Sequence, residues 1–300
     1  LGSSFDYRLD EPNVCLLNFV DYTVENGETV FNKDILEADR EIRDIFGLPQ
    51  RGGQMLQPWF SHGKNDGKAG RVRLSYSFRA DYLPDELFLA VESPDDFEIE
   101  INANKGAFEK TDKKWVDPCF SVLRISKKAF KAGRNEITLS CDFKNSLNLE
   151  AVYLLGDFAV GLDEGGAVLK ELPERILPGD IVTVEMGDIT AQGFPFYGAG
   201  ITYFADLPVS GEGRRVLQTD GYGAALIVVS DGCEEKGIWA RPYRADITGM
   251  GTAGGRFGLK YVLTRTNTFG IKCAAGGQNG SFYHPLPQGM TAGVRLCRYE

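Results

Sequence analysis

The feature that most constrains the fold is an uninterrupted alternation of apolar and polar side chains over residues 71–80. Its apolar positions are Val72, Leu74, Tyr76, Phe78 and Ala80, and arginine or serine fills every position between them. A period of two puts one face of a strand on a core and the other face in water, as in antiparallel sheets. The chain is therefore expected to contain a sheet that is buried on one side.

Further strand-like runs follow, with glycine and asparagine turns between them. They cover residues 86–92, 97–103, 122–125, 137–143 and 151–160 in the first half, and 201–205, 224–230, 257–264 and 293–299 in the second half. One segment, residues 32–46, has helical spacing in Ile35, Ala38 and Ile42, and Gly47 stops it. Short strands without intervening helices predict an all-β sandwich, in contrast to a parallel α/β sheet.

The two halves share landmarks in the same order, and 300 residues suffice for two domains. The offsets are 127, 126 and 122 residues for the pairs Tyr76 and Tyr203, Gly106 and Gly232, Gly133 and Gly255. Such offsets indicate duplication of one fold. We expect a first sandwich with the helix-containing segment at 1–170, a second sandwich at 171–300, and a connection within residues 163–178.

Charge and composition exclude several classes of function. Asp and Glu total 42 against 33 Lys and Arg, for a net charge of −9, so we expect no nucleic-acid partner. The sequence contains no window of 18 or more apolar residues, so we expect no membrane-spanning segment. Six cysteines without metal-ligand spacing and only two histidines predict free thiols and no metal site. No signal peptide is visible; because the chain starts at Leu1, we expect a fragment or a processed product, and its localisation, bacterial cytoplasmic or secreted, stays open.

Motifs of the second half resemble the sugar-binding domain of glycoside hydrolase family 2. They are the strand at 201–204, the turn Asp231-Gly232, and the run from Pro242 through Asp246-Ile247-Thr248. With residues 193–197 ahead of them, they look more specifically like the β-sandwich region that follows the barrel in α-L-rhamnosidase-like glycoside hydrolases. Residues 13–19, 152–158 and 289–296 also fit that region. The family's Asn in the turn is Asp231 here, and its Gly-x-Asn is Gly255-Arg256-Phe257.

The resemblance implies two tandem jelly-roll sandwiches of the galactose-binding-domain type with one short N-terminal helix. It implies a non-catalytic region that binds carbohydrate or supports a catalytic barrel elsewhere in a longer protein. The partners would then be a saccharide and that barrel domain. We expect no catalytic residues and no cofactor in this chain, although loop oxygens of such sandwiches can hold a structural calcium ion.

Trp239, Arg241 and Tyr243 form the first half of the predicted carbohydrate site. If they lie in a strand, they share one face. Aromatic rings give the C–H face of a sugar an apolar platform, and Arg can donate paired hydrogen bonds. A core position for Trp239 is the alternative. Tyr283 and His284 complete the predicted site, since they follow a glycine-rich stretch that we expect to be a long loop over residues 270–289.

Other motifs favour structural interpretations. Asp246 and Thr248 are expected to cap a turn, and the aromatic loop at 57–62 is expected to plug the space between helix and sheet. Acidic pairs such as Asp95-Asp96 and Glu234-Glu235 suit solvated turns, although hydrolysis of glycosides also needs two carboxylates. Two alternatives to carbohydrate binding therefore remain, a β-sandwich glycosidase active by itself and a structural or protein-interaction module.

Overall fold

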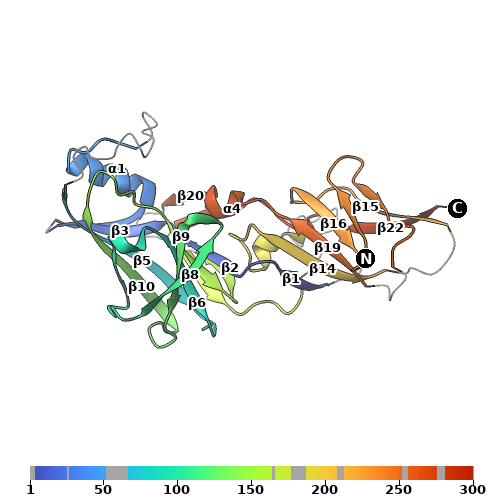
Figure 1. Ribbon diagram of the computed structural model, residues 1–300, viewed down its shortest axis with the longest axis horizontal. Coiled ribbons are helices and arrows are strands. Elements are labelled where there is room, and N and C mark those ends of the chain that lie inside the picture. The colour runs from blue at the N-terminus through green and yellow to red at the C-terminus, as the bar shows by residue number, and fades with distance from the viewer. Residues whose placement is uncertain are drawn as a thin grey trace. The chain divides into compact units, whose positions relative to one another are not determined.

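The computed structural model describes residues 4–25, 27–51, 67–163, 166–176, 187–207, 213–251, 256–275 and 281–299. They are mostly β-strand, in antiparallel sheets, and fall into two compact units. The first module comprises Val14–Glu171 and Cys273–Tyr283, and the second module comprises Leu1–Asn13, Leu172–Lys272 and His284–Glu300. The all-β fold with a short N-terminal helix agrees with the prediction (Figure 1).

The first module is built from two sheets. The larger has the order β12-β13-β5-β10-β7, with β3 also beside β5 and β4 beside β3. Its strands are β3 (Phe19–Val24), β4 (Thr29–Asp34), β5 (Gly70–Ala80), β7 (Glu98–Ile101), β10 (Gly133–Phe143), β12 (Ala159–Asp163) and β13 (Gly166–Lys170). The other has the order β2-β11-β6-β9-β8, with β2 (Asn13–Leu17), β6 (Leu87–Glu92), β8 (Phe108–Trp115), β9 (Asp117–Ile125) and β11 (Val152–Gly156). A 3₁₀ turn, η1, spans Pro94–Asp96.

The predicted helix is α1 (Ile35–Ile45), which begins where Asp34 caps it. The Asp34 carboxylate accepts a hydrogen bond from the N–H of Leu36 at 3.0 Å, which satisfies one of the free N–H groups of the first turn. Ile35, Ala38 and Ile42 are buried, so the helix presents the predicted apolar stripe to the core.

The second module also has two sheets. The larger has the order β1-β14-β19-β16-β17 and the smaller the order β18-β15-β22. The strands are β1 (Asp6–Leu9), β14 (Gly200–Asp206), β15 (Arg214–Thr219), β16 (Leu226–Ser230), β17 (Glu235–Ile238), β18 (Arg244–Asp246), β19 (Arg256–Val262) and β22 (Val294–Tyr299). The second module also holds the short helices η2 (Ile189–Gln192) and α4 (Thr266–Phe269). The paired strands β20 (Lys272–Ala275) and β21 (Ser281–His284) lie mostly within the segment of the first module that covers residues 273–283.

The chain does not divide into two continuous segments as predicted, because each module takes a piece from the other half of the sequence. Strand β1, near the N-terminus, pairs antiparallel with β14 of the second module (Figure 1). It satisfies the backbone groups that β14 would otherwise leave unpaired at a sheet edge. Conversely, the segment 273–283 belongs to the first module, where the Tyr283 hydroxyl donates a hydrogen bond to Asn18 Oδ1 at 2.8 Å.

Strand pairings support the predicted duplication. Strands β5, β6, β7, β9, β10 and β11 of the first module correspond in order to β14, β15, β16, β18, β19 and β22 of the second. In the large sheets β5 pairs with β10 and β10 with β7, as β14 pairs with β19 and β19 with β16. In the small sheets β6 lies between β9 and β11, as β15 lies between β18 and β22.

The register of the large sheets gives the residue-by-residue equivalence. Tyr76 pairs with Ile137, and the predicted offsets carry this pair onto Tyr203 and Leu259, which pair in the second module. Both tyrosines are fully buried. Residues of equal register can therefore be compared between the modules.

Candidate functional site

The candidate site lies on the outer face of the large sheet of the second module, opposite its core. Strand alternation places two cross-strand rows there. One row joins Arg8, Thr202, Lys260, Val228 and Gly237, and the other joins Phe204, Gly258, Ser230 and Glu235. Because paired residues of neighbouring strands point to the same face, these side chains surround one surface.

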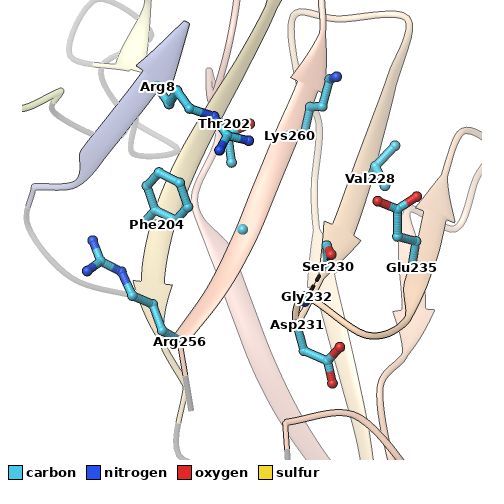
Figure 2. A pocket seen from close by; sticks show the side chains of 11 residues that line it. Arg8, Thr202, Phe204, Val228, Ser230, Asp231, Gly232, Glu235, Arg256 and Lys260 are labelled. Atoms are coloured by element: carbon cyan, nitrogen blue, oxygen red, sulfur yellow. Dashed lines mark hydrogen bonds between the residues drawn. The ribbon is translucent and has the colours of Figure 1, made fainter. Parts of the chain in front are cut away.

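A hollow of about 580 Å³ opens on this face, and most of its lining comes from the two rows. Gly258 forms its floor in the middle strand, where the absence of a side chain leaves space. A Cβ at this position would lie 3.2 Å from Thr202 Cγ2 and 3.9 Å from Phe204 Cε1. Figure 2 shows Arg8, Phe204 and Arg256 on the side of β1 and β14, and Ser230, Asp231 and Glu235 on the side of β16 and β17.

The half-buried ring of Phe204 forms the aromatic wall of the hollow. The guanidinium of Arg256 lies 5.0 Å from the ring centroid and that of Arg8 lies 5.8 Å from it, both within cation–π range. Arg256 also forms an ion pair with Asp6 at 2.7 Å. These contacts hold three planar groups side by side at the edge of the hollow.

The opposite wall is acidic and its carboxylates have different roles. Asp231 accepts backbone hydrogen bonds from Glu234 at 2.8 Å, Gly251 at 2.7 Å and Cys233 at 2.9 Å. These bonds, led by the one from Glu234, lower the pKa of Asp231 to about 2, because they stabilise the ionised form. Asp231 therefore organises the turn after β16. Glu235 is exposed at the start of β17.

Thr202 adds an unpaired polar group to the lining. Its side chain is only 4% exposed, and its hydroxyl has no hydrogen-bond partner among the residues that the structure describes. A buried hydroxyl without a partner costs roughly 1–3 kcal/mol. The hydroxyl oxygen is fully buried, and the methyl group of Thr202 lies next to the floor of the hollow.

Trp239, Arg241 and Tyr243 lie in the connection from β17 to β18, which corrects the prediction of a shared strand. Pro242 lacks the N–H that a continuous strand needs, and here the chain crosses from one sheet of the module to the other. The Arg241 guanidinium lies 5.6 Å from the centroid of the Tyr243 ring, which is half-buried against Tyr222.

Trp239 is 71% exposed, so the alternative of a core position is wrong. A Cβ on Gly237 would lie 2.5 Å from Cζ3 of Trp239, so the indole covers the side-chain face of Gly237. Gly237 pairs with Val228, which lines the hollow. The exposed indole therefore extends the outer face of the sheet beyond the hollow.

Tyr283 and His284 lie in strand β21, and residues 270–289, which were predicted to form a long loop, contain strands β20 and β21. Tyr283 belongs to the first module, where its ring packs edge-on against Phe19 at 5.7 Å. Its burial raises the pKa of the phenol well above the ordinary value. The structure thus assigns Tyr283 to the first module, and assigns Trp239, Arg241, Tyr243 and the exposed His284 to the second module.

The equivalent face of the first module is built differently. Ser77 stands where the second module has Phe204, and Glu136 where it has Gly258. Opposite charges pair across that face, as in Arg71 with Glu98 at 2.6 Å and Arg79 with Asp163 at 2.6 Å. A smaller hollow of about 390 Å³ is lined mainly by charged side chains. The glycine floor and the arginine-flanked ring belong to the second module.

Two other structural motifs of the sequence can be located. Asp246 accepts hydrogen bonds from the hydroxyl and the N–H of Thr248, which lower the pKa of Asp246 to about 2, as expected of a turn cap. The aromatic loop at 57–62 lies outside the described residues. All six cysteines are free, and Cys119 and Cys233 are exposed.

The described residues hold no cluster of three or more His, Cys, Asp or Glu side chains that could bind a metal ion. Among the helices of the described segments, none has the length and apolar character needed to cross a membrane.

Comparisons with known proteins add little to this picture. No family model matches the sequence, and no curated protein matches it. Among solved structures, the chain is similar to a rhamnosidase from Novosphingobium sp. PP1Y, with 15% sequence identity and a TM-score of 0.28. That similarity covers 77% of this chain but 23% of the rhamnosidase chain, so this chain spans about a quarter of that protein.

Proposed function

We propose that the second module binds a saccharide on the outer face of its large sheet, without itself catalysing a reaction. The observation that carries the proposal is the hollow floored by Gly258 beside the ring of Phe204. The exposed Trp239 adds a second aromatic surface on the same face.

The chemistry of this face suits a sugar ring. A pyranose has an apolar C–H face that packs against aromatic rings and hydroxyl groups that need hydrogen bonds. Phe204 supplies the apolar surface, while the side chains of Arg8, Lys260 and Glu235 supply donors and acceptors around it.

Binding is favoured over hydrolysis because of how Asp231 is held. Glycoside hydrolysis needs two carboxyl groups, one of which must be able to donate a proton. The three backbone hydrogen bonds to Asp231 stabilise its ionised form, which makes it a poor acid. Of the carboxylates lining the hollow, this leaves Glu235 alone as a candidate proton donor.

In a longer protein, such a module would hold the saccharide near a catalytic barrel or brace that barrel. The resemblance to the sandwich regions of glycoside hydrolases motivates this role. A barrel supplied as a separate protein should co-purify with the module if bracing is its main role.

A glycan array followed by calorimetry tests saccharide binding. We expect Phe204→Ala and Trp239→Ala each to weaken binding by about tenfold, since a lost stacking contact is worth on the order of 1–1.5 kcal/mol. Phe31→Ala is the matched control, because Phe31 is 65% exposed on β4 of the first module. An array without any bound glycan, or equal losses for all three variants, would contradict the proposal.

A further inference from the structure

The hollow carries three cations although the net charge of the chain is −9. Arg8, Arg256 and Lys260 all line it. Two of these cations are neutralised within the second module, because Arg256 pairs with Asp6 and Lys260 with Asp10, each at 2.7 Å. The third cation, Arg8, is the one that matters for a ligand.

Arg8 is exposed and makes no ion pair with any residue that the structure describes. It stands on β1 directly opposite Thr202 of β14, and its guanidinium lies beside the Phe204 ring. Such a guanidinium presents parallel N–H donors, a geometry that matches a carboxylate. A negatively charged group that reached this end of the hollow would gain a charge-assisted contact.

Thr202 lines the same end of the hollow, but its hydroxyl oxygen is fully buried and its methyl group lies next to Gly258. The exposed guanidinium of Arg8 is therefore the group that a carboxylate can reach at this end. Figure 2 shows Arg8 and Thr202 next to each other, as their strand pairing requires.

Charge also sets a direction across the hollow. The cations Arg8 and Arg256 lie on the side of β1 and β14, and the carboxylates of Asp231 and Glu235 lie on the side of β16 and β17 (Figure 2). An anionic group is attracted to the first side and repelled from the second. The hydroxyl groups of the same ligand can then donate to Glu235.

We infer that the ligand of the second module is an acidic saccharide, whose carboxylate binds Arg8 while its ring packs against Phe204. The inference rests on the proposed function and specifies its substrate class. A uronic acid residue carries a carboxylate and an apolar ring face in one unit, and so meets both requirements.

The test compares each acidic oligosaccharide with its own methyl ester, which keeps the sugar backbone and removes the charge. Oligomers of galacturonate, glucuronate and mannuronate are titrated calorimetrically into the whole chain, at low and high salt. We expect at least one acid to bind about tenfold more tightly than its ester, and salt to reduce that preference.

Variants connect the preference to the site. Arg8→Gln should bring the affinity for the acid close to that for the ester. Arg8→Lys should retain part of the preference, because lysine keeps the positive charge but lacks the paired N–H donors of the guanidinium. Arg73→Gln is the matched control, since Arg73 is 53% exposed on the outer face of the first module. It should leave the preference unchanged.

Three results would overturn the inference, and they differ in what they say of the proposed function. If acids and esters bind equally and Phe204→Ala weakens both, the acidic ligand is wrong while saccharide binding stands. If none of the three acids binds although a neutral glycan does, the substrate class is likewise wrong. If no glycan binds at all, the proposed function fails together with the inference.

Discussion

Replacing Gly258 with valine should separate binding from stability in the second module. The backbone of Gly258 is not in the left-handed region, so a valine can adopt it. Its Cβ would lie 3.2 Å from Thr202 Cγ2, which needs a shift of a few tenths of an ångström, and 4.0 Å from the Ser230 oxygen, which needs none. The two methyl groups would then occupy the floor of the hollow.

The magnitudes follow from the same geometry. A sugar ring that loses about 60 Å² of apolar contact at about 25 cal/mol per Å² loses about 1.5 kcal/mol, or slightly more than tenfold in affinity. Stability should move the other way, because glycine in a strand interior costs about 0.5–1 kcal/mol relative to alanine. We therefore expect weaker binding in a protein that is as stable as the parent or more so.

Calorimetry measures the affinity and urea unfolding measures the stability. Glu136→Val provides the control, since Glu136 occupies the equivalent register position in the first module and should not affect binding. The reasoning is refuted if Gly258→Val binds saccharide as tightly as the parent. It is also refuted if the variant is strongly destabilised, because Gly258 would then be required for the packing of the sheet and not for keeping the hollow open.

Three further predictions concern single contacts. Gly237→Ala should displace the Trp239 indole, weakening saccharide binding by several-fold without lowering the unfolding midpoint; unchanged tryptophan fluorescence would contradict it. Tyr76→Phe removes the hydrogen bond from the buried hydroxyl to the Glu150 carbonyl and should lower the free energy of unfolding by about 1–2 kcal/mol in urea titrations. Because the pKa of Asp231 is held at about 2, below its usual 3.8, its stabilising effect is present above pH 3.8 and is lost as the pH falls towards 2. In Asp231→Asn, the midpoint of thermal unfolding should fall less steeply between pH 3.8 and pH 2 than in the parent. An unchanged pH dependence would contradict the stabilising role of Asp231 in the turn after β16.

Local periodicity predicted most of the strands because burial acts on alternate residues. The face of β5 that carries Val72, Leu74 and Tyr76 is buried as expected, and α1 has the predicted apolar stripe. Strand β8 was missed because seven of its eight residues are exposed or half-buried, and charged side chains dominate it. Its pairing with β9 is set by the neighbouring strand and not by its own pattern.

The exchange of segments between the modules could not be predicted from local sequence. Strand β1 pairs with β14 across almost 200 residues of sequence, and this pairing depends on an edge that exists only in the folded sheet. The same holds for β21, whose Tyr283 contacts Asn18 in the first module. Sequence spacing alone placed Tyr283 beside Trp239, and the contacts of its ring and hydroxyl group it with the first module instead.

The candidate site was predicted in part. Trp239 was chosen for its chemistry, and its exposure fits that choice. Phe204 and Gly258 were missed as site residues although they occupy outward positions in strands that had been identified. An outward phenylalanine paired with an outward glycine was a usable signal, because the glycine weakens a strand and leaves open space beside the aromatic ring.

Amide chemical-shift mapping by NMR with a bound oligosaccharide tests the central claim most directly. Binding on the outer face of the second module predicts that the largest shifts fall on Gly258, Gly237 and the indole N–H of Trp239. The residues of equal register in the first module, such as Glu136, should not shift. Shifts confined to the first module, or to the loops away from this face, would contradict the account.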